Sequence, residues 1–490
     1  MATCVGTPEK TEMMETRLKA VVGRLVFPGG LTAATRHAGA EPLMTGRPQP
    51  YDESTLRVQL RKWAKGGGSE VVARQVERQV EKAVEARGVK VSAHTDMHDQ
   101  AFYTKLPAHA GPVGRLGNKI LGVTYFAVTT IELDETGPAL AYSLSWHKPA
   151  SPLGDGLVVL HANPRRHAWL SRRIRLHTLD RGGNGRKLRR WALGMRIPYL
   201  TLSGKKAHWT RYKHPTLRTA EELPVMVIPD KAVRPAGPKE PDALEPTIIV
   251  FPAHPEKREA CTKAIKYETA AKLSDDEKKT MDKVYKRRWR AMENVIKHAL
   301  AVGFGINRDR KAELTTSRGV DGKLTELDSK EAKLLGEIEQ LGPTRTAVEK
   351  RKVTARKKKL GRLRMRRAAI KRQPLTKRAR MPTGGELLCK NLMMLTLNAL
   401  ALILAGSPLE EVRTMTPLLV RELLLGRTAW ARVEKTGGMT LWVEPVNDAR
   451  QRDLQDELVR IFDRRGLTVR GHPLRLRVQK RICDPPFPHL

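Results

Sequence analysis

The sequence predicts a mixed α/β protein, because strand-like and helix-like periodicities alternate along its central part. In residues 88–103 apolar and polar side chains alternate with a period of two, as in a strand with one apolar and one polar face. From Tyr285 to Arg308 apolar residues instead recur every three or four positions, as in an amphipathic helix. Between these two stretches strand and helix patterns follow one another, which favours a mixed sheet flanked by helices.

The composition points to a polyanionic partner. The chain has 490 residues, a formal net charge of +39 and a pI near 10.4, a balance that favours binding to DNA or, equally, to RNA as in ribosomal proteins. Hydrophobic residues make up 40% of the chain, enough for packed cores in about two to four domains. The four cysteines form no C-x-x-C pair, so a zinc knuckle is not predicted.

No membrane partner is expected. The N-terminal residues include acids and no apolar run, so they do not predict a signal peptide. The longest apolar run, Leu392 to Ala405, is interrupted by Asn398 and preceded by Lys390 and Asn391, which predicts a buried helix and not a membrane span. We expect a cytoplasmic, nucleoid-associated protein.

Changes of pattern divide the chain into four predicted segments. Residues 1–88 hold two helical stretches and form a helical domain that could bind DNA. Residues 89–310 hold the mixed sheet, with an insertion rich in Lys, Pro and His at 204–243. Residues 311–383 combine an amphipathic helix with an almost wholly basic stretch, which predicts either an arm lying along phosphates or a solvated tail. Residues 384–490 predict a small α+β unit in which no chemistry is apparent.

Within 89–310 the elements are predicted in a fixed order. After the first strand, apolar alternation predicts two more strands; a short helix precedes the strand that ends on Asp180, and a glycine-rich break leads to a further helix and strand. The expected ranges are 120–131 and 137–148 for the strands, 164–171 for the helix, 173–180 for the strand ending on Asp180, 186–195 for the second helix and 197–203 for the last strand.

The helix from Tyr285 to Arg308 is predicted to bury one apolar stripe and to carry an acid at its border. The stripe consists of Tyr285, Trp289, Met292, Ile296 and Ala299. Glu293 borders it and could point into a crevice while the helix stays anchored. The alternative is a surface ion pair between Glu293 and Lys297 at i, i+4.

Three acids are expected to come together. Asp96 lies on the polar face of the first strand, Asp180 ends a later strand before Gly182 and Gly183, and Glu293 lies on the following helix. Neighbouring strands of one sheet would bring the two aspartates close, and a helix beside the sheet could deliver the glutamate. Three carboxylates around two hard cations suit phosphoryl transfer on DNA.

Three blocks resemble, in order and spacing, the acidic motifs of DDE-type insertion-sequence transposases. The blocks are HTDMHDQAFYTK, LDRGGNGRKLRRWALGMRIPYLTL and YKRRWRAMENVIK. The resemblance covers about residues 50–310 and, more faintly, the end of the chain. It implies an RNase H-like core with two Mg²⁺ or Mn²⁺ ions bound by the catalytic residues Asp96, Asp180 and Glu293. It also implies that a group of residues contacts DNA near the cut end: Tyr285, Arg288, Arg290 and Lys297.

Some residues depart from the family pattern. Gly183 stands where the family usually has an aromatic residue, and one extra residue separates Arg288 from Glu293, so Arg290 could take the role of Arg288. The copy could also be inactive.

Several assignments stay open. Asp99 competes with Asp96 as the first acid but has the opposite strand parity. Glu268 competes with Glu293 as the third acid. His94 and His98 could instead bind a transition metal in an unrelated hydrolase, although hydrogen bonding to an acid is the commoner role. A further set of residues, Trp191 and Trp209, could stack on bases near a cut end.

The predicted function is that of a DNA transposase, acting as a homodimer on double-stranded DNA. It would bind the ends of its own element, cut the 3′ strands and join them to target DNA. The alternatives are a non-catalytic nucleic-acid-binding protein derived from a transposase and an unrelated divalent-metal nuclease.

Overall fold

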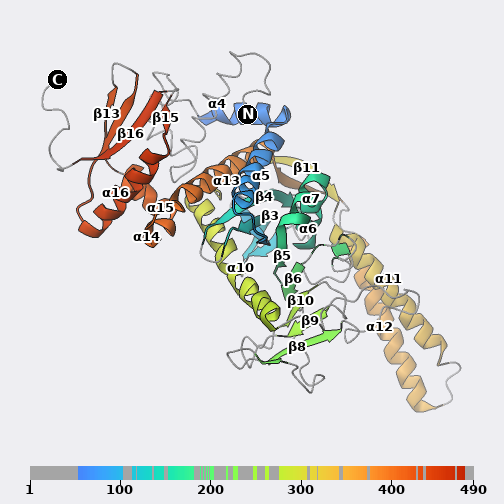
Figure 1. Ribbon diagram of the computed structural model, residues 1–490. Helices are drawn as coiled ribbons and strands as arrows, with labels where there is room; N and C mark the ends of the chain where they lie inside the picture. Colours follow the sequence, from blue (N-terminus) through green and yellow to red (C-terminus); the bar gives the residue numbers. More distant parts are fainter. Residues whose placement is uncertain are drawn as a thin grey trace. The chain divides into compact units, whose positions relative to one another are not determined.

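Figure 1 shows the computed structural model of the protein, and the element labels below are those of the figure. The structure describes residues 53–102, 113–116, 119–134, 137–147, 153–180, 199–202, 217–218, 224–229, 247–250, 260–263, 275–305, 310–316, 318–341, 346–371, 376–425, 429–433, 437–469 and 472–479, with residues 188, 191, 192, 195, 197 and 427.

The chain folds into two compact units. The first consists of Met1–Gln100, Tyr125–Asp309 and Pro382–Leu490, and the second of Ala101–Thr124 and Arg310–Met381. The predicted N-terminal helical domain, sheet domain and C-terminal unit therefore share one compact unit, and the predicted basic arm belongs to the other.

A mixed sheet organises the first unit, which confirms the predicted α/β class. Its central strands lie in the order β4-β3-β1-β5-β6. β3 and β4 are antiparallel, whereas β1 is parallel to β5 and β5 is parallel to β6. The strands are β1 (Val91–Phe102), β3 (Lys119–Glu132), β4 (Ala139–His147), β5 (Ile174–Leu179) and β6 (Tyr199–Leu202).

Antiparallel strands extend this sheet beyond β6, in the order β10-β9-β8-β7. They are β7 (Leu217–Arg218), β8 (Pro224–Pro229), β9 (Thr247–Val250) and β10 (Ala260–Lys263). β7 and β8 fall in the predicted insertion, the rest of which lies outside the described residues.

Helices cover both faces of β1, so the prediction of one apolar and one polar face was wrong. Val91, Ser92, Ala93, His94 and Thr95 are all at most 4% exposed. An inner strand with a parallel neighbour is commonly covered on both sides. Polar residues are tolerated here because they bond to one another: His94 Nδ1 lies 2.7 Å from Thr178 Oγ1, and Thr95 Oγ1 lies 2.6 Å from His177 Nε2.

Consecutive residues of β1 point to opposite faces, and different helices cover these faces. On the Thr95 face lies α6 (Leu153–His161), where a Cβ added to Gly156 would come within 2.6 Å of Ala127 Cβ. The absence of a side chain lets α6 approach the sheet. On the opposite face lies α10 (Asp275–Ala301), whose Met292 Sδ accepts a hydrogen bond from Thr130 Oγ1 at 3.0 Å.

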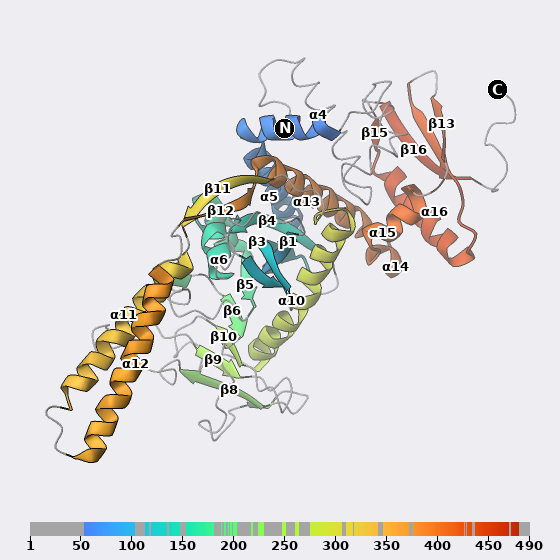
Figure 2. The same ribbon diagram turned by 180° about the vertical axis from the view of Figure 1, so that it is seen from behind.

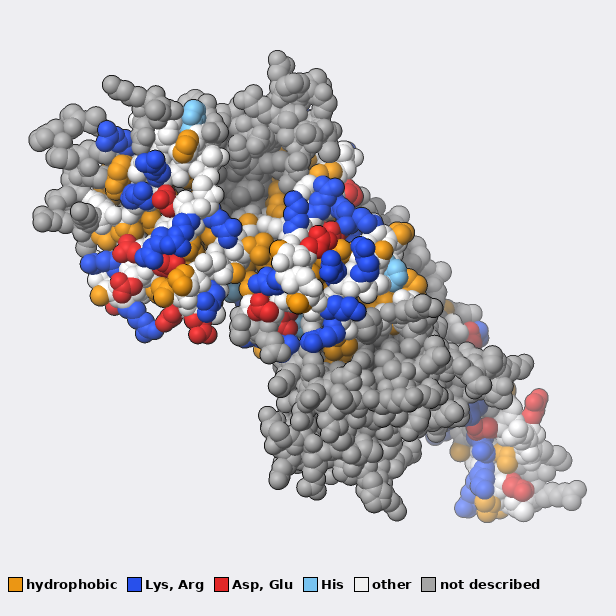
Figure 3. Space-filling model, viewed as in Figure 1, with side chains coloured by type: hydrophobic (Ala, Val, Ile, Leu, Met, Phe, Trp, Pro, Cys, Tyr) orange, Lys and Arg blue, Asp and Glu red, His pale blue; other side chains and the backbone are white. Residues whose placement is uncertain are grey.

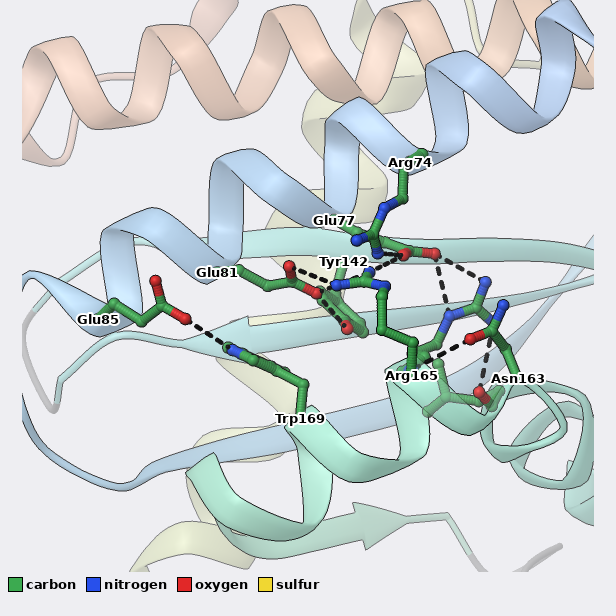
Figure 4. A network of polar contacts seen from close by, with 10 residues as sticks. Arg74, Glu77, Glu81, Glu85, Tyr142, Asn163, Arg165 and Trp169 are labelled. Atoms are coloured by element: carbon green, nitrogen blue, oxygen red, sulfur yellow. Dashed lines mark hydrogen bonds and ion pairs between the residues drawn. The ribbon is translucent and has the colours of Figure 1, made fainter.

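Acidic residues of α5 (Gly68–Glu85) hold α7 (Pro164–Arg173) in place (Figure 4). Arg165 binds Glu77 at 2.7 Å and Glu81 at 2.9 Å, and Trp169 Nε1 donates to Glu85 at 3.3 Å. The three glutamates recur every four residues, so they share one face of α5. Because β5 begins directly after α7, these contacts between α5 and α7 also fix the position of the strand that leads to Asp180.

The apolar helix α13 (Gly384–Leu404) is long and apolar enough to cross a membrane by length and composition, but half of its apolar stretch is buried inside the protein. It packs against α5 and α4 (Glu53–Lys65). Its Asn398 side chain bonds to the backbone N–H and C=O of Ala141 in β4, at 2.8 and 2.7 Å. These contacts are those of a core helix, as the sequence predicts.

The chain after α13 ends in a four-stranded sheet, β13-β14-β16-β15, with α16 packed along β16 (Figures 1 and 2). Three short helices precede it, and an apolar cluster around Val446, Leu458 and Ile461 links α16 to them. The elements are α14 (Glu410–Arg413), α15 (Pro417–Val420), η6 (Arg421–Leu425), β13 (Ala429–Val433), β14 (Met439–Val443), α16 (Ala449–Arg464), β15 (Thr468–Val469) and β16 (His472–Val478).

The second unit contains a helical hairpin of α11 (Arg318–Glu339) and α12 (Ala347–Lys371) (Figure 2). Ion pairs join the two helices, at 2.8 Å between Arg364 and Glu331 and at 3.1 Å between Arg356 and Glu337. Two strand pairs complete the described part of this unit: β2 (Val113–Leu116) with the start of β3, and β11 (Arg310–Thr316) with β12 (Thr376–Pro382).

Candidate active site

Asp96 and Asp180 lie side by side on the sheet, at the point where β5 ends. The parallel strands β1 and β5 pair Thr95 with Leu179, and the next residue of each strand path is an aspartate. Asp180 directly follows the carboxyl end of β5, whereas Asp96 lies in the middle of the longer strand β1. Open α/β sheets bind ligands outside the carboxyl ends of their strands. Both carboxylates reach solvent, with side chains 31% and 47% exposed.

Arg288 of α10 joins the two aspartates. Its Nη1 donates to Asp96 Oδ2 at 3.0 Å and its Nη2 to Asp180 Oδ1 at 3.3 Å. The arginine side chain is only 9% exposed, so the guanidinium is a largely buried cation between two more accessible anions. Such fork-like hydrogen bonding fixes the geometry as well as the charge.

Burial and charge act in opposite directions on Asp96. Burial raises the pKa of Asp96, the positive charge of Arg288 and a hydrogen bond from the Met97 N–H lower it, and the neighbouring charge of Asp180 raises it again; the net shift is upward. A carboxyl group in this position gains from any cation that comes close to it.

The buried face of α10 differs from the predicted stripe. Met292 and Ala299 are buried as predicted, but Trp289 is 64% exposed and Arg288 takes the buried position in its place. The buried face is therefore shifted toward Arg288, Ala291 and Val295. The physical reason is that Asp96 and Asp180 provide partners for a buried arginine, which hydrophobic periodicity does not register.

Glu293 is not drawn into the aspartate pair. Its carboxylate lies 3.6 Å from the ammonium group of Lys297, and the two side chains are 35% and 65% exposed. This is the i, i+4 surface pair that the sequence allowed as the alternative. Burial and the charge of Lys390 lower the pKa of His98, and the charge of Glu293 opposes this shift. The charge of Glu293 is therefore felt at His98, two residues after Asp96 on β1.

A second polar cluster lies next to the aspartates and escaped sequence reasoning. Glu132 at the end of β3 is 3% exposed and accepts a hydrogen bond from Arg287 Nε at 3.2 Å. His94 Nε2 lies 3.6 Å from the same oxygen, and Arg290 3.9 Å from the other. The signal was present as a lone acid in an otherwise apolar strand, since a buried charge demands a partner.

The described residues supply part of a divalent-cation site. Asp96 and Asp180 are hard oxygen donors of the kind that Mg²⁺ and Mn²⁺ prefer. Among the residues that the structure describes, no group of three or more His, Cys, Asp or Glu side chains is placed to hold a metal ion. The two aspartates thus fit as ligands, provided that Arg288 moves aside and a third ligand joins them.

The structure also places some of the other candidate residues named from the sequence. His94 bonds to Thr178 and pairs with Glu132, so it is a hydrogen-bonding histidine of the kind expected. Arg290 is 53% exposed, and Trp191 is partly buried against the core that contains α6 and α7. Several candidates lie outside the described residues or have side chains outside them: Asp99, Trp209, Glu268 and Tyr285.

The sequence matches no known protein family, and no curated protein is significantly similar to it.

Proposed function

We propose that the chain is a DNA transposase of the DDE type, which cuts the ends of its own element and joins them to target DNA. The observation that carries the proposal is the pairing of Asp96, in the middle of β1, with Asp180, which directly follows the adjacent parallel strand β5. The resemblance of the three acidic blocks assigns the same two residues to one site.

The strand order supports an RNase H-like core. Such a core has an antiparallel half, a central strand with the first acid and a parallel half with the second acid. The order β4-β3-β1-β5-β6 has an antiparallel β3–β4 pair on one side of β1 and the parallel strands β5 and β6 on the other. The first acid then lies on the central strand and the second on its neighbour.

In this proposal Asp96 and Asp180 hold the cations, and Glu293 provides the third carboxylate after leaving Lys297. Bound Mg²⁺ would lower the pKa of the attacking water or 3′-hydroxyl and stabilise the leaving oxygen. Arg288, once released from the aspartates, would bind a phosphate of the DNA end. It therefore has two alternative anionic partners, the aspartate pair and the DNA backbone.

Exposed basic side chains supply the affinity for the DNA backbone. Arg290 and Lys297 lie on the same helix as Arg288, with side chains 53% and 65% exposed. On the hairpin, α12 turns one group of arginines toward α11 and leaves a long series exposed: Lys350, Arg351, Lys352, Lys357, Lys358, Lys359, Arg362 and Arg366. Such a series releases counterions on binding to phosphates. Two ends must be cut together, so a homodimer on double-stranded DNA is part of the proposal.

The test is cleavage of the DNA that flanks the coding sequence. We expect Mg²⁺-dependent nicking of a labelled end fragment, followed by joining to a target plasmid. Asp180→Asn should keep end binding and lose nicking by at least about a hundredfold. The matched control is Asp453→Asn, an exposed acid of α16, which should cleave normally. Nicking by Asp180→Asn at near the wild-type rate would remove Asp180 from the site.

One observation favours a second candidate, a non-catalytic DNA-binding protein. Arg288 pairs with both aspartates at 3.0 and 3.3 Å, so the aspartate pair has a counter-charge without an ion. This candidate predicts end binding with no Mg²⁺-dependent nicking under any condition, whereas an unrelated nuclease would cut without end specificity or joining.

A further inference from the structure

The C-terminal sheet carries an ordered array of aromatic and basic side chains that the proposed active site does not use. In the β13–β14 pair Trp430 lies opposite Trp442, and in the β14–β16 pair Trp442 lies opposite Arg477. Two residues along, Arg432, Thr440 and Arg475 form a second row of register partners. Directly opposite residues and residues two apart share a face, so all six lie on one side of the sheet.

The two faces of this sheet differ in character. The alternate positions are apolar, with Leu441 opposite Ala431 and Leu476, and Val443 opposite Val478. Val443 is 5% exposed at one end of this apolar face and Val433 62% exposed at the other, and on the opposite face Thr440 is 6% exposed. We call the other side the Trp–Arg face, defined by Trp430, Arg432, Trp442, Arg475 and Arg477.

The Trp–Arg face combines accessible charge with half-buried rings. Arg432, Arg475 and Arg477 are exposed, whereas Trp430 and Trp442 are partly exposed. Arg477 pairs with Asp463 of α16 at 2.8 Å, with its side chain still 49% exposed. Figure 3 shows Lys and Arg side chains interspersed with Asp and Glu over the part of the molecule that holds this sheet and α16.

We propose that the Trp–Arg face binds single-stranded DNA, with bases stacked on the tryptophans and phosphates held by the arginines. Two large rings on one strand pair give the face of a base a flat partner, and stacking of this kind does not depend on sequence. The bases of a duplex are covered by their neighbours, so flat rings on a sheet reach unpaired bases only. The arginines supply the positive charge that follows the backbone, in a chain whose net charge is +39.

The choice of DNA over RNA rests on the proposed function, because a strand-cutting and strand-joining enzyme creates unpaired DNA ends. Binding itself does not rest on it, since no residue of the Trp–Arg face belongs to the aspartate site. The two proposals can therefore fail separately: a loss of strand binding leaves nicking at the aspartates untouched, and an absence of nicking leaves strand binding untouched.

The experiment measures fluorescence anisotropy of a labelled oligothymidylate of about twelve nucleotides, within the site size of one binding platform, with the full chain in EDTA. We expect Trp430→Leu and Arg475→Gln each to weaken binding by about fivefold or more, and Trp430→Phe to retain most of it. The matched control is Arg450→Gln, which removes an exposed charge of α16, 82% accessible, and should leave the affinity unchanged.

Competitors and folding controls complete the test. Each variant must keep the wild-type urea midpoint, and Trp430→Phe distinguishes a stacking role from a packing role. Duplex DNA of the same length should bind all variants alike. The proposal would be overturned if the variants lost as much affinity for duplex DNA as for the single strand, or if neither variant lost affinity. It would also be overturned if the protein bound oligouridylate more tightly than oligothymidylate.

Discussion

Replacing Arg288 by Met tests whether the arginine occupies the place of a cation. Methionine keeps much of the apolar stem of arginine but removes its charge. The change deletes the hydrogen bonds to Asp96 at 3.0 Å and to Asp180 at 3.3 Å, and it leaves two carboxylates facing each other without a counter-charge.

The magnitude follows from the exposure of the partners. Hydrogen bonds to charged groups contribute about 1.5–3 kcal/mol each when buried, but the aspartate side chains are 31% and 47% exposed, so water can replace part of the loss. We expect the free energy of unfolding in EDTA to fall by about 2 kcal/mol, measured by urea denaturation.

Magnesium should reverse part of this loss. With the guanidinium gone, Asp96 and Asp180 are open to a hard cation, and binding to the folded state alone stabilises it by about 1.4 kcal/mol at a concentration ten times the Kd. Wild-type protein should gain less, because Arg288 competes with the ion. In Arg290→Met the aspartate pair is intact, so this control should respond to Mg²⁺ as the wild type does.

The result that would refute this reasoning is an equal effect of Mg²⁺ on wild type and Arg288→Met. The double variant Asp180→Asn with Arg288→Met gives the complementary check, because it should lose the extra stabilisation by Mg²⁺. If it keeps that stabilisation, the ion binds elsewhere.

Three further predictions concern the rest of the chain. Replacing Lys357–Lys359 by glutamine should reduce the slope of log affinity for DNA against log salt by roughly 0.9 for each phosphate that α12 no longer neutralises, and an unchanged slope in filter binding would detach α12 from the DNA. Burial lowers the pKa of His161 to about 3, so as the pH falls the unfolded chain binds a proton at this histidine before the folded protein does. The free energy of unfolding should therefore be full above about pH 6.5 and fall toward pH 3 by up to about 1.4 kcal/mol per pH unit. Urea titrations across this range should show a smaller slope for His161→Phe. Lys390→Met should lower the free energy of unfolding by about 3 kcal/mol, because the buried Glu386, 3.5 Å away, loses its counter-charge. Adding Glu386→Leu should restore part of this stability. Equal stability of the wild type and Lys390→Met would contradict this prediction.

The sequence predicted the aspartate pair because that prediction needed only local patterns. Asp96 lay on the polar face of one strand pattern and Asp180 ended another, and neighbouring strands of one sheet bring two such residues together. The same patterns located most described helices and strands, including α7, β3 and β5. The register of β1 with β5 then places Asp96 and Asp180 within reach of a single guanidinium.

The failures share one physical cause. Hydrophobic periodicity assumes that polar residues face solvent, yet His94 and Ser92 are buried on β1 and Arg288 is buried on α10. A polar side chain can be buried when fixed partners satisfy it, and those partners come from elements far apart in sequence. Glu132 was missed for the same reason, since Arg287 reaches it from 155 positions along the chain.

The third acid shows where this cause matters most. Glu132 lies closer to the sheet interior, but Arg287 at 3.2 Å and His94 at 3.6 Å already hold its carboxylate, which is 3% exposed. Taking it out of that cluster would leave a largely buried arginine without its anion, at a cost of several kcal/mol. Glu293 is bound by one exposed i, i+4 pair with Lys297, which is worth only about 0.5 kcal/mol. Glu293 could therefore turn toward Asp96 at little cost, although it lies outside the aspartate pair in this structure.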